Sequence, residues 1–142
     1  MSFTGNLAVK EEIMNPSLNA ELRRCQKWIE DALGYAGGTH DYEDIVESVH
    51  KGRMQLWAGE EGCAITEIIK YPKMSTLHVF LAGGKMEQII DFQTSAAEFA
   101  KMNGCSKMTL AGRHGWTRVL SKHGWEHSFS VMSKEWRERW KH

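Results

Sequence analysis

The spacing of apolar residues changes from a helical period to a strand period near residue 52, and this change constrains the fold more than any other feature. Between residues 16 and 50, apolar side chains recur at steps of three and four, which is typical of amphipathic helices. Between residues 53 and 82, three short alternating runs are separated by GEEG and YPKMS. Links this short join antiparallel neighbours. The sequence therefore predicts helices followed by a three-strand antiparallel meander over 53–59, 62–71 and 75–82.

Two helices are predicted before this meander. The first covers residues 15–33 and begins at an Asn-Pro-Ser sequence that favours a helix entrance. The second starts at Tyr42, with Thr39 and Asp41 as capping candidates, and ends at Gly52. The earlier stretch NLAVKEEI is compatible with a short strand.

Helical spacing returns after the meander, over residues 85–103, and is followed by the strand-like stretch SKMTLAGR. The right-handed crossover rule places this strand parallel to 75–82, beside it or one place removed. A short helix over 115–123 and a final strand over about 127–134 complete the order. We therefore predict an α+β fold, an α/β sandwich whose mixed, mainly antiparallel sheet is flanked by helices.

Length and composition indicate a single globular domain over 1–142, in which 1–20 is weakly patterned and 135–142 is a Trp/Arg-rich tail. Hydrophobic content of 42% and charged content of 25% fit a soluble protein. No apolar run approaches the roughly 18 residues that a membrane span needs, and the first residues lack a secretory pattern. Three widely spaced cysteines indicate neither a disulfide framework nor a metal site. We expect a cytoplasmic protein without a metal.

The charge is unevenly distributed although the net charge is zero. Residues 1–72 carry 7 Lys/Arg and 12 Asp/Glu, whereas residues 73–142 carry 11 and 6. A basic C-terminal half can attract an anionic ligand, but it contains no basic run with interleaved aromatic residues. We interpret the two halves as differently charged faces and do not expect a nucleic-acid partner.

The triplet His-Gly-Trp occurs twice, at 114–116 and 123–125, on either side of the predicted short helix. Two histidines this far apart, without an acidic partner or a third ligand, make a poor nucleophile or metal site. We expect glycine to provide tight backbone geometry at both corners, with Gly124 as a helix C-cap. The repeat is therefore interpreted as mainly structural.

The element order resembles the GNAT N-acetyltransferase fold, and the C-terminal stretch TRVLSKHGWEH resembles that family's helix and turn before its sixth strand. TEIIKYP, LAGG and GRHGWTRVL together resemble small GNAT-like proteins of phages and prophages. The resemblance covers roughly residues 40–135 and depends on the order of short motifs. It implies a GNAT-like fold, phage origin and an acyl-CoA-dependent N-acyltransferase activity that uses acetyl-CoA or another acyl-CoA.

The resemblance also implies a site for the acyl-CoA pyrophosphate in LAGGKMEQ, where Ala82, Gly83, Gly84, Lys85 and Met86 match the family's phosphate loop. Glycines at a helix entrance let backbone N–H groups approach an anion, and a lysine adds positive charge. The family's loop has more glycines and a leading Gln or Arg. The alternative is that the Gly-Gly pair forms only a tight strand-to-helix turn.

The catalytic residues depart further from the family pattern. The family's tyrosine, which protonates the departing thiolate, is replaced here by Leu120, and Ser121 or His123 lies close by as a substitute donor. Candidate bases are Glu67 and His78, which occupy strand positions where an apolar residue is usual. Burial can raise the pKa of such a carboxylate toward a useful range. The alternative is that both side chains point to water.

Other polar and aromatic candidates lie toward the C-terminus. Arg113 and Arg118 follow a strand end, where α/β sheets usually bind ligands; the alternative is a surface ion pair. Trp136 and Trp140 share one face if the tail is helical. This favours a protein partner, self-association or a peripheral membrane contact, unless the two residues fold back on the domain. The alternative function is a non-enzymatic phage protein, a virion component or host-directed binding protein, that uses this scaffold for interaction.

Overall fold

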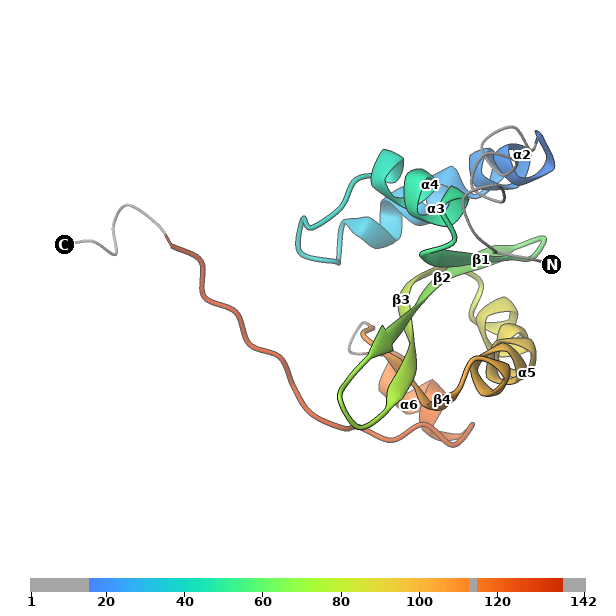
Figure 1. Cartoon of the computed structure of the whole chain (residues 1–142). Coiled ribbons are helices and arrows are strands. Elements are labelled where there is room, and N and C mark those ends of the chain that lie inside the picture. Colours follow the sequence, from blue (N-terminus) through green and yellow to red (C-terminus); the bar gives the residue numbers. More distant parts are fainter. Residues whose placement is uncertain (1–15, 113–114, 137–142) are drawn as a thin grey trace. The chain divides into compact units, whose positions relative to one another are not determined.

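The computed structural model describes residues 16–112 and 115–136, which belong to two compact units, Met1–Gly112 and Arg113–His142. Each unit is described by itself. The expected strand over 6–13 lies outside the described residues. The elements, in chain order, are α2 (Pro16–Arg24), α3 (Gln26–Leu33), α4 (Tyr42–His50), β1 (Met54–Ala58), β2 (Gly62–Lys70), β3 (Ser75–Gly84), α5 (Met86–Met102), β4 (Cys105–Leu110) and α6 (Trp116–Ser121) (Figure 1).

The four strands form one mixed sheet in the order β1-β2-β3-β4. β1 pairs with β2 and β2 with β3 in antiparallel fashion, whereas β4 runs parallel to β3. The predicted meander, the parallel strand beside it and the α+β fold class are therefore confirmed. β3 differs in one respect, because it continues two residues beyond the predicted end and includes Gly83 and Gly84.

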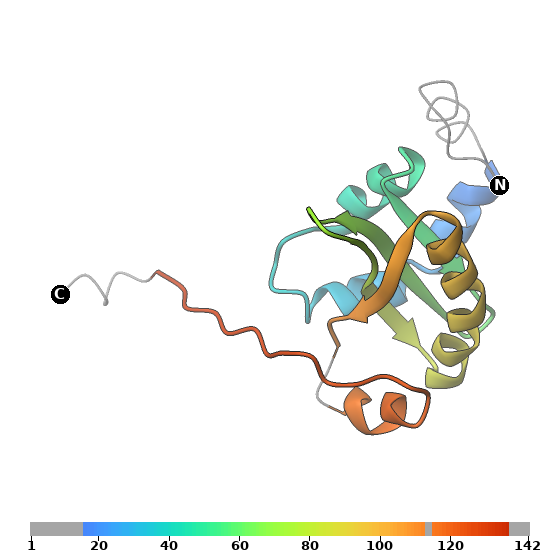
Figure 2. The same cartoon turned by 60° about the horizontal axis from the view of Figure 1, so that its bottom comes forward.

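Helices cover both faces of the sheet. Helices α2, α3 and α4 lie on one face and α5 lies on the other (Figure 1), and Figure 2 gives a second view of these layers. The core on the first face consists of Leu22, Cys25, Ile29, Ala32, Ile45, Val49, Met54, Cys63, Ile65 and Leu81. The core under α5 contains Leu77, Ala96 and Ala100 with partly buried Trp57, Ile68, Phe99, Cys105 and Met108. Burial of these apolar side chains is the main stabilising contribution to the fold.

The single helix predicted over 15–33 is wrong, because α2 and α3 are separated at Cys25. Cys25 keeps αR backbone angles (φ −88°, ψ −1°), its N–H donates to the Glu21 carbonyl (3.0 Å), and its side chain is fully buried. The buried positions Leu22, Cys25 and Ile29 nevertheless keep helical spacing through the break. The spacing of apolar residues therefore could not reveal the separation.

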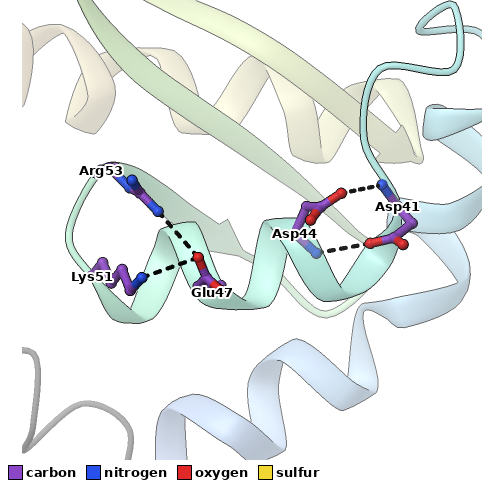
Figure 3. Close-up of polar contacts among 5 residues, drawn as sticks. All are labelled: Asp41, Asp44, Glu47, Lys51 and Arg53. Carbon is purple, nitrogen blue, oxygen red and sulfur yellow. Dashed lines mark hydrogen bonds and ion pairs between the residues drawn. The ribbon is translucent and has the colours of Figure 1, made fainter.

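Helix α4 begins at Tyr42 as predicted, and Asp41 is its N-cap. The Asp44 backbone N–H donates to Asp41 Oδ1 (2.9 Å), and the Asp41 N–H donates to Asp44 Oδ2 (3.0 Å), which forms a reciprocal capping box (Figure 3). One turn from its end, Glu47 accepts from Lys51 (3.1 Å) and Arg53 (3.3 Å). These contacts fix both ends of the helix that leads into β1.

In the second unit, the predicted short helix is confirmed as α6. Gly124 has φ +88°, and the Trp125 N–H donates to the Leu120 carbonyl (3.2 Å), as expected for a glycine C-cap. The expectation for Gly115 is wrong: its φ of −67° is available to any residue. The final strand over 127–134 is also wrong, because residues 125–136 contain no strand. Alternation alone does not make a strand when no neighbouring strand pairs with it in the described unit.

Candidate active site

A row of residues crosses the sheet at the level of His78. The register pairs Met54 with Glu67, Glu67 with His78, and His78 with Thr109. Cross-strand partners share one face of a sheet, and Met54 belongs to the core beneath α2–α4. Glu67, His78 and Thr109 therefore lie on that face, and all three are half-buried. The structure thus brings together the two residues predicted as candidate bases.

The ring of His78 is held by a polar contact. Its Nδ1 lies 2.8 Å from Thr109 Oγ1. Burial lowers the pKa of His78, and the charge of Glu67 opposes this effect only in part. An imidazole with a lowered pKa is neutral at pH 7 and so keeps a lone pair for a proton.

β3 and β4 separate one rung beyond this row. Their pairing ends at Val79 with Leu110, whereas the pairing of β3 with β2 continues to Gly84. In the described residues, the stretch 80–84 of β3 has no strand neighbour on its β4 side. We call this the β3–β4 fork. Backbone N–H and C=O groups that lack a ladder partner are available to a ligand.

The register also shifts beside the fork. Thr66 pairs with Val79 and Ile65 pairs with Leu81, so Phe80 is an extra residue, a β-bulge in β3. The Phe80 ring contacts the imidazole of His40, with ring centroids 4.8 Å apart. Bulges occur frequently next to active sites because they redirect side chains and interrupt pairing.

The Gly83–Gly84 pair belongs to β3 rather than to a loop, and packing accounts for both glycines. A Cβ on Gly83 would lie 2.9 Å from the Trp28 carbonyl oxygen of α3. Gly84 has φ +94°, and a Cβ there would overlap the backbone at Glu61 and Gly62. The alternative of a tight strand-to-helix turn therefore takes another form, in which close packing against α3 and β2 accounts for both glycines.

Backbone donors at the start of α5 are partly used. The Lys85 N–H donates to the Glu61 carbonyl (2.9 Å), and the Lys85 ammonium pairs with the Glu61 carboxylate (2.6 Å), which raises the lysine pKa. The Gln88 N–H donates to the Lys85 carbonyl. Helix geometry leaves the N–H groups of Met86 and Glu87 without acceptors in their own helix. These two amides, beside the fork, fit a phosphate group; Lys85 offers only a charge that is already paired.

The remaining predicted site residues lie in the second unit. Ser121 donates its hydroxyl to the Arg118 carbonyl at 2.9 Å within α6, and both residues are exposed. Arg113 lies outside the described residues. The roles of these residues, and those of Ala82, Gly83, Gly84, Lys85 and Met86 in cofactor binding, remain predictions.

Thr109 is missing from the sequence-based candidates. A threonine in a half-buried strand gives no signal of its own, and only the strand register reveals that it meets His78. In the described part of the chain, no cluster of three or more His, Cys, Asp or Glu residues has the geometry of a metal site. None of the described helices is long and apolar enough to span a membrane.

Comparison with solved structures identifies the fold. The chain is similar to a GNAT family acetyltransferase of Staphylococcus aureus, with TM-score 0.58 and 16% identity over 86% of this chain and 94% of that one. It is similar to an acetyltransferase of Trypanosoma brucei, with TM-score 0.57 and 12% identity over 80% and 94%. A possible acetyltransferase of Clostridium difficile gives TM-score 0.54 and 10% identity over 84% and 93%. The fold is therefore GNAT-like. No protein-family model and no curated protein matches the sequence.

Proposed function

We propose that this chain is an acyl-CoA-dependent N-acyltransferase that uses acetyl-CoA or another acyl-CoA. The observation that carries the proposal is the β3–β4 fork, which opens one rung beyond the pair of His78 and Thr109. A thioester bound in the fork would lie near the neutral imidazole of His78, which is on the face of the sheet that α2–α4 cover. The GNAT-like fold supports the proposal by analogy.

In this proposal, His78 is the general base. When bound, the acyl-CoA supplies an activated acyl group to an amine acceptor. The lowered pKa of His78 keeps its ring neutral at pH 7, so it can take the proton that the attacking amine loses. Glu67, its cross-strand partner, stabilises the imidazolium that results. Leu120 cannot donate a proton. The departing thiolate can take its proton from solvent, and a role for Ser121 as the donor stays a prediction from the sequence.

The acyl-CoA pyrophosphate would lie at the start of α5. Ala82, Gly83 and Gly84 form the wall of the fork, the Met86 N–H donates to the anion, and Lys85 contributes positive charge. An anion-binding role for Arg113 and Arg118, which belong to the second unit, stays a prediction from the sequence. A hydrogen bond to a charged group contributes about 1.5–3 kcal/mol, so one amide has a measurable effect on affinity.

The Met86 amide can be removed by a single substitution. Met86→Pro deletes this N–H together with the methionine side chain and keeps the helix, because proline suits the first helical position and Lys85 before it is extended (φ −76°, ψ 137°). We expect Met86→Pro to weaken acetyl-CoA binding roughly tenfold or more in calorimetry. The matched control, Met86→Ala, keeps the amide and should bind as the wild type does. Equal affinity in both variants would show that the pyrophosphate does not bind at the start of α5.

Activity is tested by following release of the free thiol from acetyl-CoA with a panel of small and peptide amines. His78→Gln should lower the rate about 100-fold or more, as removal of a general base does. The same variant should leave the calorimetric affinity for acetyl-CoA unchanged. No binding by the wild type at millimolar acetyl-CoA would refute the proposal.

A second proposed function is non-enzymatic. The second unit exposes large apolar side chains, with Phe129, Val131, Met132 and Trp136 exposed by 73%, 83%, 94% and 86%. Exposed apolar surface of this kind often marks a protein interface. In this proposal the chain is a phage protein, in the host cytoplasm or the virion, that binds a protein partner or a second copy through this segment. Serine substitution of Phe129 and Met132 should abolish self-association in analytical ultracentrifugation.

A further inference from the structure

Thr109 contacts His78 at the base of the β3–β4 fork. Its Oγ1 lies 2.8 Å from His78 Nδ1, and the two residues are register partners on adjacent parallel strands. One more rung, Val79 with Leu110, separates this contact from the point where the strands part. The imidazole is therefore anchored through one nitrogen, and its second nitrogen, Nε2, is the one that remains for a reacting group.

The direction of this hydrogen bond decides whether the ring can act as a base. A neutral imidazole carries one N–H and one lone pair on its two nitrogens. If the Thr109 hydroxyl donates to Nδ1, then Nε2 carries the hydrogen and has no lone pair to offer. If Thr109 instead accepts from Nδ1–H, then Nε2 keeps its lone pair. Only the second arrangement leaves a base at the fork.

We propose that Thr109 is a positioning residue whose hydroxyl oxygen accepts the Nδ1–H of His78, so that Nε2 presents its lone pair to the amine acceptor. This inference rests on the proposed acyltransferase function. A protonated ring also keeps its Nδ1–H, so the contact to Thr109 persists while the proton is transferred. A serine or threonine hydroxyl can do this, whereas a valine of similar shape cannot.

The proton and electron pairs balance in this arrangement. The amine lone pair attacks the thioester carbon, the C–N bond forms and the C–S bond breaks. Nε2 takes the proton that the nitrogen loses and later releases it to solvent, and the departing thiolate takes a proton from solvent. In the described residues, Glu67 from β2 is the charged group that faces His78 across the strand pair, while β4 presents the neutral Thr109.

The first test measures the His78 tautomer in the free protein, so it does not depend on activity. The protein is labelled with ¹⁵N-histidine, and the His78 signals are assigned by their loss in His78→Gln. We expect the wild type and Thr109→Ser to hold the hydrogen on Nδ1 at pH 8. Thr109→Val should lose this preference while keeping the wild-type urea midpoint. A hydrogen on Nε2 in the wild type, or no change in Thr109→Val, would overturn the inference.

The second test is kinetic. Thr109→Val should lower kcat by roughly tenfold, a part of the 10²–10⁴-fold contribution of a general base, with little change in the KM for acetyl-CoA. Thr109→Ser should restore the rate to within about twofold, and the lower limb of the pH–rate profile should move only in the valine variant. An inactive wild type with the Nδ1–H tautomer intact would refute the acyltransferase proposal and support the positioning role. An active wild type with the Nε2–H tautomer would refute the positioning role and support the acyltransferase proposal.

Discussion

Two places along β3 carry candidate sites, and packing explains them to different degrees. At the C-terminal end, Gly83 and Gly84 lie against α3 and β2 so closely that a Cβ has no room. Farther back in the same strand, His78 is half-buried and bonded to Thr109. When packing fully explains why a residue is a glycine, that residue gives no information about a ligand. A half-buried histidine bonded to a threonine does, because an apolar pair there would avoid the cost of burying polar groups.

The strongest test of this contrast is Gly84→Ala. A Cβ would lie 2.3 Å from the Glu61 carbonyl oxygen, and φ +94° strains any other residue. We expect a loss of roughly 3 kcal/mol in the free energy of unfolding, measured by urea denaturation. Gly104→Ala is the matched control, because Gly104 has φ +75° with nothing within 4 Å and should lose only about 1 kcal/mol. Equal losses would mean that backbone strain, and not close packing, explains Gly84.

A smaller effect is expected for Gly83→Ala. Its Cβ would lie 2.9 Å from the Trp28 carbonyl oxygen and 3.1 Å from the Trp28 Cβ, so α3 must shift away from β3. We expect a loss of roughly 2 kcal/mol in the same assay. Gly115→Ala, at φ −67° with nothing within 4 Å, should stay within about 0.5 kcal/mol of the wild type. If Gly83→Ala leaves the free energy of unfolding unchanged, the space beside Gly83 is open, and the junction of β3 and α5 becomes a candidate ligand site again.

Sequence patterns predicted the part of this fold that depends on local periodicity. The change of period near residue 52 located α4 and the three antiparallel strands, and the crossover rule located β4 beside β3. The break at Cys25 and the missing strand over 127–134 were not predictable in this way. Apolar spacing continues through the break at Cys25. Formation of a strand over 127–134 depends on a neighbouring strand that the local sequence does not specify.

The candidate site was predictable in its residues but not in its geometry. Glu67 and His78 stand out because they are polar within strand patterns, whereas Thr109 does not. Their alignment in one row depends on strand register, and the register of β3 shifts at Phe80 and that of β4 shifts beside Ser75. Counting residues along the sequence therefore places cross-strand partners one residue out of position.

His78 should make the stability of the protein depend on pH. Burial lowers its pKa in the folded state below the ordinary 6.5, so the unfolded chain binds more protons between these two values. The free energy of unfolding therefore rises with pH through that window, and it falls when the solution is acidified below 6.5. His78→Gln should flatten this slope in urea titrations between pH 7 and pH 5. His123→Gln, at an exposed position, is the control and should keep the wild-type slope. An unchanged slope in His78→Gln would show that another group is responsible.

The smallest effect on stability is expected at Lys85, at the junction of β3 and α5. It separates packing from ligand binding at this junction. Lys85 and Glu61 form an exposed ion pair, with side chains exposed by 60% and 54%. Such pairs contribute little because water and salt screen them, so Lys85→Ala should leave the urea midpoint unchanged. The acyltransferase proposal expects weaker binding of acetyl-CoA in the same variant, most clearly at low salt, because one positive charge near the pyrophosphate is lost. Lys101→Ala, near the far end of α5, should change neither property. If Lys85→Ala binds acetyl-CoA as the wild type does, the junction of β3 and α5 is a packing feature alone. The acyl-CoA site then depends on the β3–β4 fork and on His78.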